Sequence, residues 1–196
     1  MLVIYWFIFL ILYQSRSSLE KILWKIEKSP SYHLPSLAMA PPLKILVVGP
    51  KEGGKSAVCA WILECEKTNG RAQASVEIWD CSGDQVYEAC WPAILKDANA
   101  TVIVYNPDSH VHESEVTLWY EWFVQNAALE PAQCLVFAHA NGKATVTTRG
   151  KVNLPPSVKT IQTNYESPGV LKSEFDTFVF GIAEQVQLRQ GGRTRK

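Results

Sequence analysis

The chain has 196 residues, 47% of them apolar, and no formal net charge at pH 7. This length fits one α/β domain of about 150 residues with a packed core, and the balanced charge argues against nucleic acid as a partner. The five cysteines form no Cys-x-x-Cys pair, which favours reduced thiols in the cytoplasm over a secreted disulfide scaffold.

Residues 1–38 are predicted to lie outside the fold. Residues 1–13 are almost wholly apolar, but a helix of that length, at about 1.5 Å per residue, is shorter than the ~30 Å membrane core. They also lack the basic start of a signal peptide, and the four prolines in residues 29–42 are typical of a linker. Three interpretations stay open: an extension before a natural start at Met39, a membrane-surface or signal-anchor segment, and a secretory signal.

Apolar strands alternate with helices in the rest of the chain. The run 43–48 is almost continuously apolar, as in a parallel strand with both faces covered. The patterns predict strands over 43–48, 75–80, 100–105, 134–138 and 158–163, and helices over 55–66, 87–96, 110–126 and 170–186. This alternation predicts an α/β fold with a doubly wound, mostly parallel sheet.

The predicted helix over 110–126 carries several aromatic residues. Trp119, Trp122 and Phe123 recur at positions i, i+3 and i+4, which predicts one buried stripe. Tyr120 is predicted to lie on the other face, where it could contact a partner.

A phosphate-binding motif joins the first strand to the first helix. Residues 49–56, here called the phosphate loop, match Gly-x-x-x-x-Gly-Lys-Ser. Glycines let the backbone approach phosphates closely, and the dipole of the following helix favours anions. We expect Lys55 to reach the β- and γ-phosphates and the Ser56 hydroxyl to hold Mg²⁺.

A second motif, Asp-Cys-Ser-Gly-Asp, occupies residues 80–84, here called the metal-side turn. Asp80 ends a predicted strand, so its carboxylate should reach the carboxyl edge of the sheet and could hold the metal directly or through water. Gly83 would let its backbone N–H meet a γ-phosphate. The alternative is that Asp80 is an ordinary turn residue.

Two longer runs carry a family resemblance. The phosphate loop and the metal-side turn resemble those of Rab-related small GTPases, and the runs 77–98 and 119–125 are similar to the intraflagellar transport protein 22 family, also called Rab-like protein 5. The resemblance covers about residues 43–185. It implies a P-loop small-GTPase fold that binds GTP or GDP with Mg²⁺. It also implies a protein of the cytoplasm, cilium and ciliary base that docks onto coiled-coil subunits of intraflagellar transport complex B and acts in cilium assembly and ciliary transport.

The resemblance also implies which residues form the site, with Ser56 and Asp80 as metal ligands. The implied nucleotide-binding residues are Gly49, Pro50, Lys51, Glu52, Gly53, Gly54, Lys55, Ser56, Asp80, Cys81, Ser82, Gly83, Asp84, His139, Ala140, Asn141 and Gly142. Small GTPases usually recognise guanine with Asn-Lys-x-Asp, but residues 139–143 read His-Ala-Asn-Gly-Lys and offer no Asp for the base. Either Asn141 or Lys143 contacts the base, or this is an ordinary surface loop. The preference for guanine over adenine therefore follows from the resemblance alone.

The chain departs from the family pattern in two places. Only residues 68–75 separate the first helix from the second strand, too few for a switch loop and a further strand. We therefore expect the switch I region and the antiparallel edge strand to be missing. Asp84 stands where many GTPases carry a water-orienting Gln, and because a carboxylate repels a γ-phosphate, we predict very slow or absent hydrolysis.

The leading hypothesis is a GTP-binding adaptor with a domain over 39–187 and a basic tail over 188–196. The tail holds no cysteine, so no prenyl membrane anchor is expected. Two alternatives remain: a Rab-like membrane-trafficking GTPase, and a nucleotide-free interaction module.

Overall fold

The computed structural model describes residues 42–63, 75–140, 152–166 and 168–193. The predicted extension over 1–38 lies outside these ranges. The strands are β1 (Leu43–Val48), β2 (Val76–Asp80), β3 (Ala100–Tyr105), β4 (Cys134–Ala140) and β5 (Lys159–Asn164). The helices are α3 (Lys55–Leu63), α4 (Trp91–Leu95), α5 (His110–Tyr120) and α6 (Pro168–Arg193), with the 3-10 helices η1 (Gln85–Cys90) and η3 (Pro131–Gln133) and the π-helix η2 (Glu121–Gln125).

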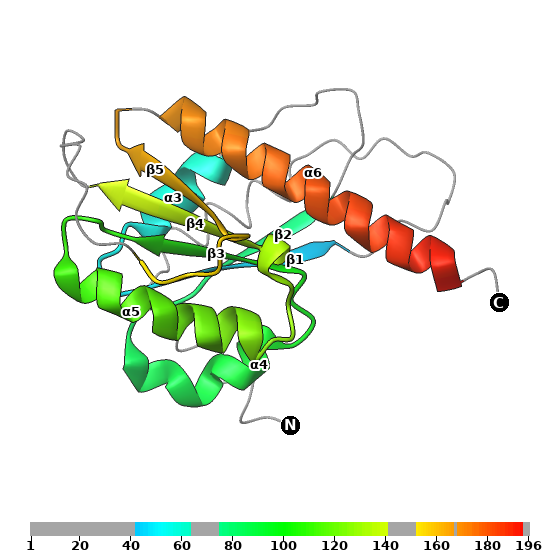
Figure 1. The fold of residues 1–196 in the computed structure, drawn as a ribbon, viewed down its shortest axis with the longest axis horizontal. Coiled ribbons are helices and arrows are strands. Elements are labelled where there is room, and N and C mark those ends of the chain that lie inside the picture. Colours follow the sequence, from blue (N-terminus) through cyan, green and yellow to red (C-terminus); the bar gives the residue numbers. More distant parts are fainter. Residues whose placement is uncertain (1–41, 64–74, 141–151, 167, 194–196) are drawn as a thin grey trace, which may run out of the picture. The chain divides into compact units, whose positions relative to one another are not determined.

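The strands form one sheet in the order β2-β1-β3-β4-β5, and every neighbouring pair runs parallel (Figure 1). The chain builds β2 on one side of β1 and then crosses to the other side to build β3. This doubly wound arrangement confirms the predicted fold class. No antiparallel strand occurs within the described ranges, where β2 ends the sheet with Trp79 40% exposed. Residues 64–74, between α3 and β2, lie outside these ranges, so the predicted loss of the switch I region and the edge strand stays a prediction.

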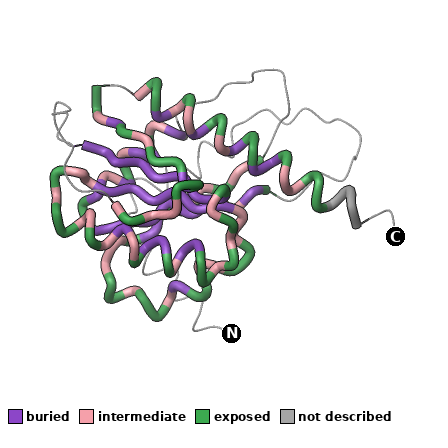
Figure 2. The backbone as a smooth tube through the Cα atoms, viewed as in Figure 1, coloured by how far each residue is buried: buried purple, intermediate pink, exposed green. Residues whose placement is uncertain are grey.

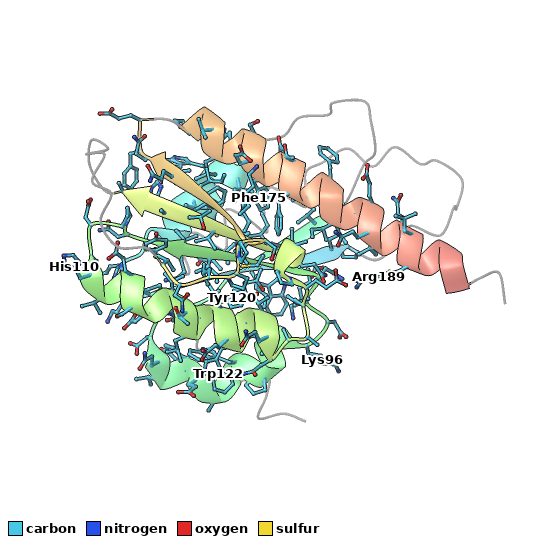
Figure 3. The ribbon with its side chains drawn as sticks, in the orientation of Figure 1. Lys96, His110, Tyr120, Trp122, Phe175 and Arg189 are labelled. Atoms are coloured by element: carbon cyan, nitrogen blue, oxygen red, sulfur yellow. The ribbon has the colours of Figure 1, made fainter. Side chains whose placement is uncertain are left out.

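Helices cover both faces of the sheet. One core lies between the sheet and the helices α3 and α6, and the other between the sheet and the helices α4 and α5 (Figure 1). Strands β3 and β4 are buried along their whole length (Figure 2), because their apolar side chains meet a helical layer on each side. Phe175, labelled in Figure 3, anchors α6 in the first core, and Trp91 anchors α4 in the second. No helix in the part of the chain that the structure describes is both long and apolar enough to cross a membrane.

Two of the predicted helices are divided in the structure. The segment predicted over 87–96 consists of η1 and α4, and Pro92 lies in the first turn of α4, where its missing N–H leaves no hydrogen bond unmade. The segment predicted over 110–126 consists of α5 and the π-helix η2. The hydrophobic pattern therefore located both segments but could not show where their hydrogen bonding changes.

The aromatic stripe of α5 and η2 is wider than predicted. Burial is confirmed for Trp119 and Phe123, and Trp122 is partly buried. The prediction that Tyr120 lies on the outer face is wrong, because Tyr120 is only 4% exposed. The buried residues Val116, Trp119, Tyr120, Phe123 and Val124 follow the spacing i, i+3, i+4, i+7 and i+8, which gives a helix a broad apolar face.

Candidate functional site

The phosphate loop begins at the carboxyl end of β1, between β2 and β3. The chain switches here from one side of β1 to the other, and open α/β sheets bind ligands at such points. Gly49 has a φ of +139°, and a Cβ atom on it would lie 2.1 Å from the Val104 carbonyl oxygen of β3. Only glycine lets the loop turn this close to the neighbouring strand.

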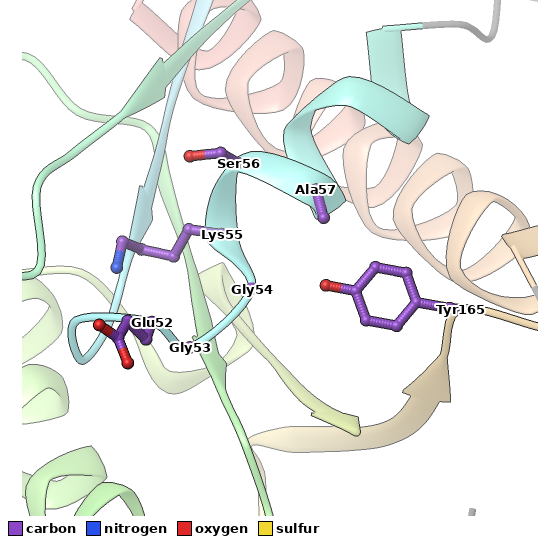
Figure 4. Close-up of a pocket in the computed structure, with 7 residues that line it drawn as sticks. All are labelled: Glu52, Gly53, Gly54, Lys55, Ser56, Ala57 and Tyr165. Carbon is purple, nitrogen blue, oxygen red and sulfur yellow. The ribbon is translucent and has the colours of Figure 1, made fainter. Parts of the chain in front are cut away.

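Lys55 begins α3, and its side chain folds back under the loop (Figure 4). Its Nζ donates hydrogen bonds to the carbonyl oxygens of Gly49, at 3.0 Å, and Pro50, at 2.6 Å. Burial lowers the pKa of Lys55, although the nearby Asp80 carboxylate acts to raise it. An ammonium group has three N–H donors, so one remains for an anion in the adjoining cavity.

The structure places the two predicted metal ligands side by side. The Ser56 hydroxyl donates a hydrogen bond of 2.7 Å to Asp80 Oδ2. Loss of surrounding water raises the pKa of the Asp80 carboxyl, although the Ser56 hydrogen bond and Lys55 act to lower it. Mg²⁺ takes oxygen ligands and keeps several waters. These residues therefore fit a magnesium–nucleotide site, in which Ser56 and Asp80 would hold the metal.

The metal-side turn lies directly on the phosphate loop. The Cys81 N–H donates to the Val47 carbonyl at 2.9 Å, which continues the pairing of β1 with β2. A Cβ atom on Gly83 would lie 2.4 Å from the Gly49 oxygen and 2.5 Å from the Lys51 nitrogen, so glycine is required for the two motifs to touch. The Cys81 side chain belongs to the core, where burial raises the pKa of its thiol to about 12. Among the predicted site residues, Cys81 thus has a packing role.

Asp84 completes the turn and begins η1. Its N–H donates to Ser82 Oγ at 3.2 Å, and its Oδ1 accepts the N–H of Val86 at 3.1 Å, which caps η1. The other oxygen, Oδ2, lies 3.8 Å from Lys51 Nζ. Both carboxylate oxygens of Asp84 therefore have partners within the protein.

A cavity of ≈ 470 Å³ opens at the phosphate loop. It is lined by Glu52, Gly53, Gly54, Lys55, Ser56, Ala57 and Tyr165 (Figure 4). Among the described residues, Tyr165 is the one lining residue outside α3 and the loop, and it is absent from the predicted site. It directly follows β5, and this place at the carboxyl edge of a parallel sheet is the signal that could have identified it.

Tyr165 packs against two other rings, Trp61 of α3 and His139 of β4; we call the three the aromatic trio. Their ring centroids are 4.7 Å apart for His139 and Tyr165, 5.2 Å for Trp61 and Tyr165, and 5.4 Å for Trp61 and His139, all with edge-to-face geometry. Such contacts add to the apolar area that the rings bury, so the trio fixes the orientation of Tyr165 at the cavity.

His139 supports the loop from behind and does not line the cavity. It is fully buried, and a Cβ atom on Gly54 would lie 2.8 Å from its Cδ2. Its Nδ1 lies 3.0 Å from Thr163 Oγ1, whereas Nε2 has no hydrogen-bond partner among the described residues. Burial lowers the pKa of His139.

The predicted nucleotide-binding residues that follow His139 are only partly described by the structure. Ala140 ends β4 and is 8% exposed. Asn141 and Gly142 lie outside the residues that the structure describes, as does Lys143.

Negative charge exceeds positive charge around the loop. Two lysines, Lys51 and Lys55, and three carboxylates, Glu52, Asp80 and Asp84, belong to the phosphate loop and the metal-side turn. This excess disfavours a bare polyphosphate and favours one neutralised by a divalent cation. No three His, Cys, Asp or Glu side chains cluster as a metal site within the described ranges, so phosphate and water would have to complete the ligand set.

No family model matches the chain, but curated proteins do. The intraflagellar transport protein 22 homolog of Homo sapiens is 33% identical over 165 aligned residues, which cover 71% of this chain and 89% of that protein. The homolog of Danio rerio is 33% identical over 176 residues, which cover 76% of this chain and 94% of that protein. Since 71% of 196 residues is fewer than 165, the human relative contains residues that have no counterpart here.

Solved structures of T. brucei IFT22 share the fold. The GTP-bound crystal structure has a TM-score of 0.55 at 26% identity and covers 72% of this chain and 95% of its own. The GDP-bound structure has a TM-score of 0.57 at 25% identity and covers 75% of this chain and 99% of its own. The GTP-bound IFT22/74/81 structure has a TM-score of 0.58 at 24% identity and covers 76% and 99%, and this likeness concerns the fold alone.

Proposed function

This chain belongs to the intraflagellar transport protein 22 family, and from that premise we propose that it binds guanine nucleotide with Mg²⁺ as a subunit of intraflagellar transport complex B. The observation that carries the proposal is the 2.7 Å contact of Ser56 with Asp80, beside the buried Lys55 and the glycine-rich loop. Nucleotide-binding loops of this class need these groups together. The guanine base is supported by the GTP- and GDP-bound forms of T. brucei IFT22.

Each group has a distinct task in this proposal. Lys55 keeps one N–H donor for phosphate oxygens, and the loop amides at the start of α3 add further donors where the helix dipole favours anions. Ser56 and Asp80 would supply oxygen ligands to Mg²⁺. When bound, Mg²⁺ neutralises phosphate charge, which the excess of carboxylates around the loop makes necessary.

We infer that hydrolysis is very slow or absent. Asp84 occupies the position after Gly83, and its ionised carboxylate can accept hydrogen bonds but cannot donate one. Its two oxygens already have partners in the Val86 N–H and the Lys51 ammonium. A group held in this way is poorly suited to orient a water molecule toward a γ-phosphate.

Family membership supports an adaptor role in ciliary transport, which we propose for this chain. The relatives are named for intraflagellar transport, and T. brucei IFT22 has been crystallised as IFT22/74/81. We propose that residues 39–187 form the docking domain and that coiled-coil subunits corresponding to 74 and 81 are its partners. The protein would then act in the cytoplasm, the cilium and the ciliary base, in cilium assembly and ciliary transport.

Nucleotide binding can be tested by titrating the full-length chain with fluorescent GTP and GDP analogues, with and without Mg²⁺. Saturable binding that requires Mg²⁺ and is lost in Lys55→Ala is expected. Lys96→Ala is the matched control, because Lys96 is an exposed lysine that follows α4 (Figure 3). A folded wild-type protein that binds neither analogue would refute the proposal.

The adaptor role needs a separate test. The full-length chain is co-expressed with the subunits that correspond to 74 and 81, and the complex is sought by affinity purification. Co-purification is expected from the wild type. If the chain binds nucleotide but never co-purifies with either subunit, the adaptor role is wrong and the nucleotide site stands alone.

A further inference from the structure

The phosphate loop and the metal-side turn meet at one ion pair. Lys51 of the loop and Asp84 of the turn lie 3.8 Å apart, measured from Nζ to Oδ2. The backbones also touch here, because a Cβ atom on Gly83 would lie 2.5 Å from the Lys51 nitrogen. The pair therefore spans the seam between the two motifs that bind phosphate and metal.

Asp84 cannot easily turn away from this seam. Its Oδ1 accepts the Val86 N–H at 3.1 Å and caps η1, and its own N–H donates to Ser82 Oγ at 3.2 Å. Its negative charge is thus fixed next to Gly83, the residue whose N–H we expect at a γ-phosphate. A fixed carboxylate in that place opposes the binding of a terminal phosphate unless a cation offsets it.

Lys51 is the cation that faces this carboxylate. Lys55 cannot take its place, because two of its three donors bind the carbonyl oxygens of Gly49 and Pro50. We propose that Lys51 determines the preference of the site for a nucleoside triphosphate over a diphosphate by neutralising Asp84 at the seam. This inference rests on the proposed nucleotide binding and concerns only the third phosphate.

The size of the effect is limited by solvent. The Lys51 side chain is 72% exposed and that of Asp84 is 39% exposed, and exposed ion pairs change an equilibrium by about fivefold at most. Lys51→Gln should therefore lower the ratio of triphosphate to diphosphate affinity by up to about fivefold. The affinity for the diphosphate should fall less than that for the triphosphate, because the terminal phosphate is the group next to Asp84.

The test is a double-mutant cycle on the full-length chain. Wild type, Lys51→Gln, Asp84→Asn and the double variant are titrated with a fluorescent hydrolysis-resistant GTP analogue and with fluorescent GDP, both with Mg²⁺. Asp84→Asn removes the charge but keeps a side-chain oxygen that can cap Val86. Lys96→Gln is the charge-matched control on an exposed lysine away from the seam. Circular dichroism checks that every variant is folded.

We expect Lys51→Gln to have a lower ratio of triphosphate to diphosphate affinity than the wild type. The double variant should have a ratio near or above the wild-type value. An unchanged ratio in Lys51→Gln would overturn it. So would a double variant as weak as Lys51→Gln, because Lys51 would then act on the phosphate directly and not through Asp84. A wild type that binds neither probe would instead refute nucleotide binding itself.

Discussion

Two parts of the site are held together by different interactions. One part is the phosphate loop with the metal-side turn, and the other is the aromatic trio. The first is fixed by backbone contacts and charge: Lys55 binds loop carbonyls, Ser56 binds Asp80, and Gly83 touches the loop backbone. The trio is fixed by ring packing between residues of α3, β4 and the turn after β5, and its buried His139 leaves Nε2 without a partner among the described residues. The first part therefore depends on a few polar contacts within two short segments, whereas the second depends on how distant segments pack.

The variant with the largest expected effect tests the backbone contacts of the phosphate loop. Gly49→Ala would place a Cβ atom 2.1 Å from the Val104 oxygen at a φ of +139°. We expect it to lower the free energy of unfolding by about 3 kcal/mol or more, as measured by urea denaturation. Gly181→Ala, within α6, is the control, because its added Cβ meets no atom within 4 Å. Its free energy of unfolding should rise by up to about 1 kcal/mol. Equal stability of the two variants would show that the loop does not need glycine here.

A second prediction tests the charge of the metal-side turn. Only ionised Asp80 can hold Mg²⁺, and loss of surrounding water raises the pKa of this carboxyl above its usual value. Mg²⁺-dependent nucleotide affinity should therefore be retained above the raised pKa and fall as the pH drops through it, by about tenfold per pH unit below it. The fall should begin at a less acidic pH than an ordinary aspartate would give. Titrations in buffers of decreasing pH measure it, and an identical profile in Asp80→Asn would assign the effect to another group.

The same contrast explains what could be predicted from the sequence. β1 and β3 were located because their residues are almost continuously apolar, and the loop was located because phosphate binding requires fixed residue types in a fixed order. The rule that parallel strands end at one edge placed Asp80 at the carboxyl edge of the sheet, and the structure adds its contact with Ser56. Tyr165 was missed because it belongs to no motif, and its place directly after β5, at the carboxyl edge of the sheet, was the only sequence signal that could have identified it.

Two other features depend on three-dimensional packing. Tyr120 is buried because α5 contacts the sheet over a wide face. The spacing of Trp119, Trp122 and Phe123 alone predicts a narrower stripe. The change to π hydrogen bonding in η2 leaves no mark in the hydrophobic spacing. Local patterns thus predicted the elements and the phosphate loop, while contacts between distant elements required the structure.

A third prediction asks whether the aromatic trio contributes to binding. Tyr165 lines the same cavity as Lys55 and Ser56, and we expect its ring to contact the base of a bound nucleotide. Tyr165→Ala should weaken GTP binding by about tenfold, since stacking of a base on an aromatic ring contributes about 1–3 kcal/mol. Inorganic tripolyphosphate with Mg²⁺, which has no base, should bind both proteins equally. Tyr165→Phe keeps the ring and should behave like the wild type, and equal weakening of both ligands in Tyr165→Ala would place the effect on the loop.

The smallest expected effect concerns strain within the phosphate loop. Glu52 has a φ of 63°, a left-handed conformation that costs a side-chain-bearing residue about 1–2 kcal/mol. Glycine removes this cost but loses more chain entropy on folding, by roughly 0.5–1 kcal/mol. Glu52→Gly should therefore raise the free energy of unfolding by about 0.5–1 kcal/mol, measured by urea denaturation without nucleotide or metal. Ala60→Gly in α3 introduces glycine into a regular helix and should instead lower the free energy of unfolding by about 1 kcal/mol. The opposite signs separate relief of strain from the general effect of glycine, and a destabilised Glu52→Gly would mean that the carboxylate, and not the backbone, determines the shape of the loop.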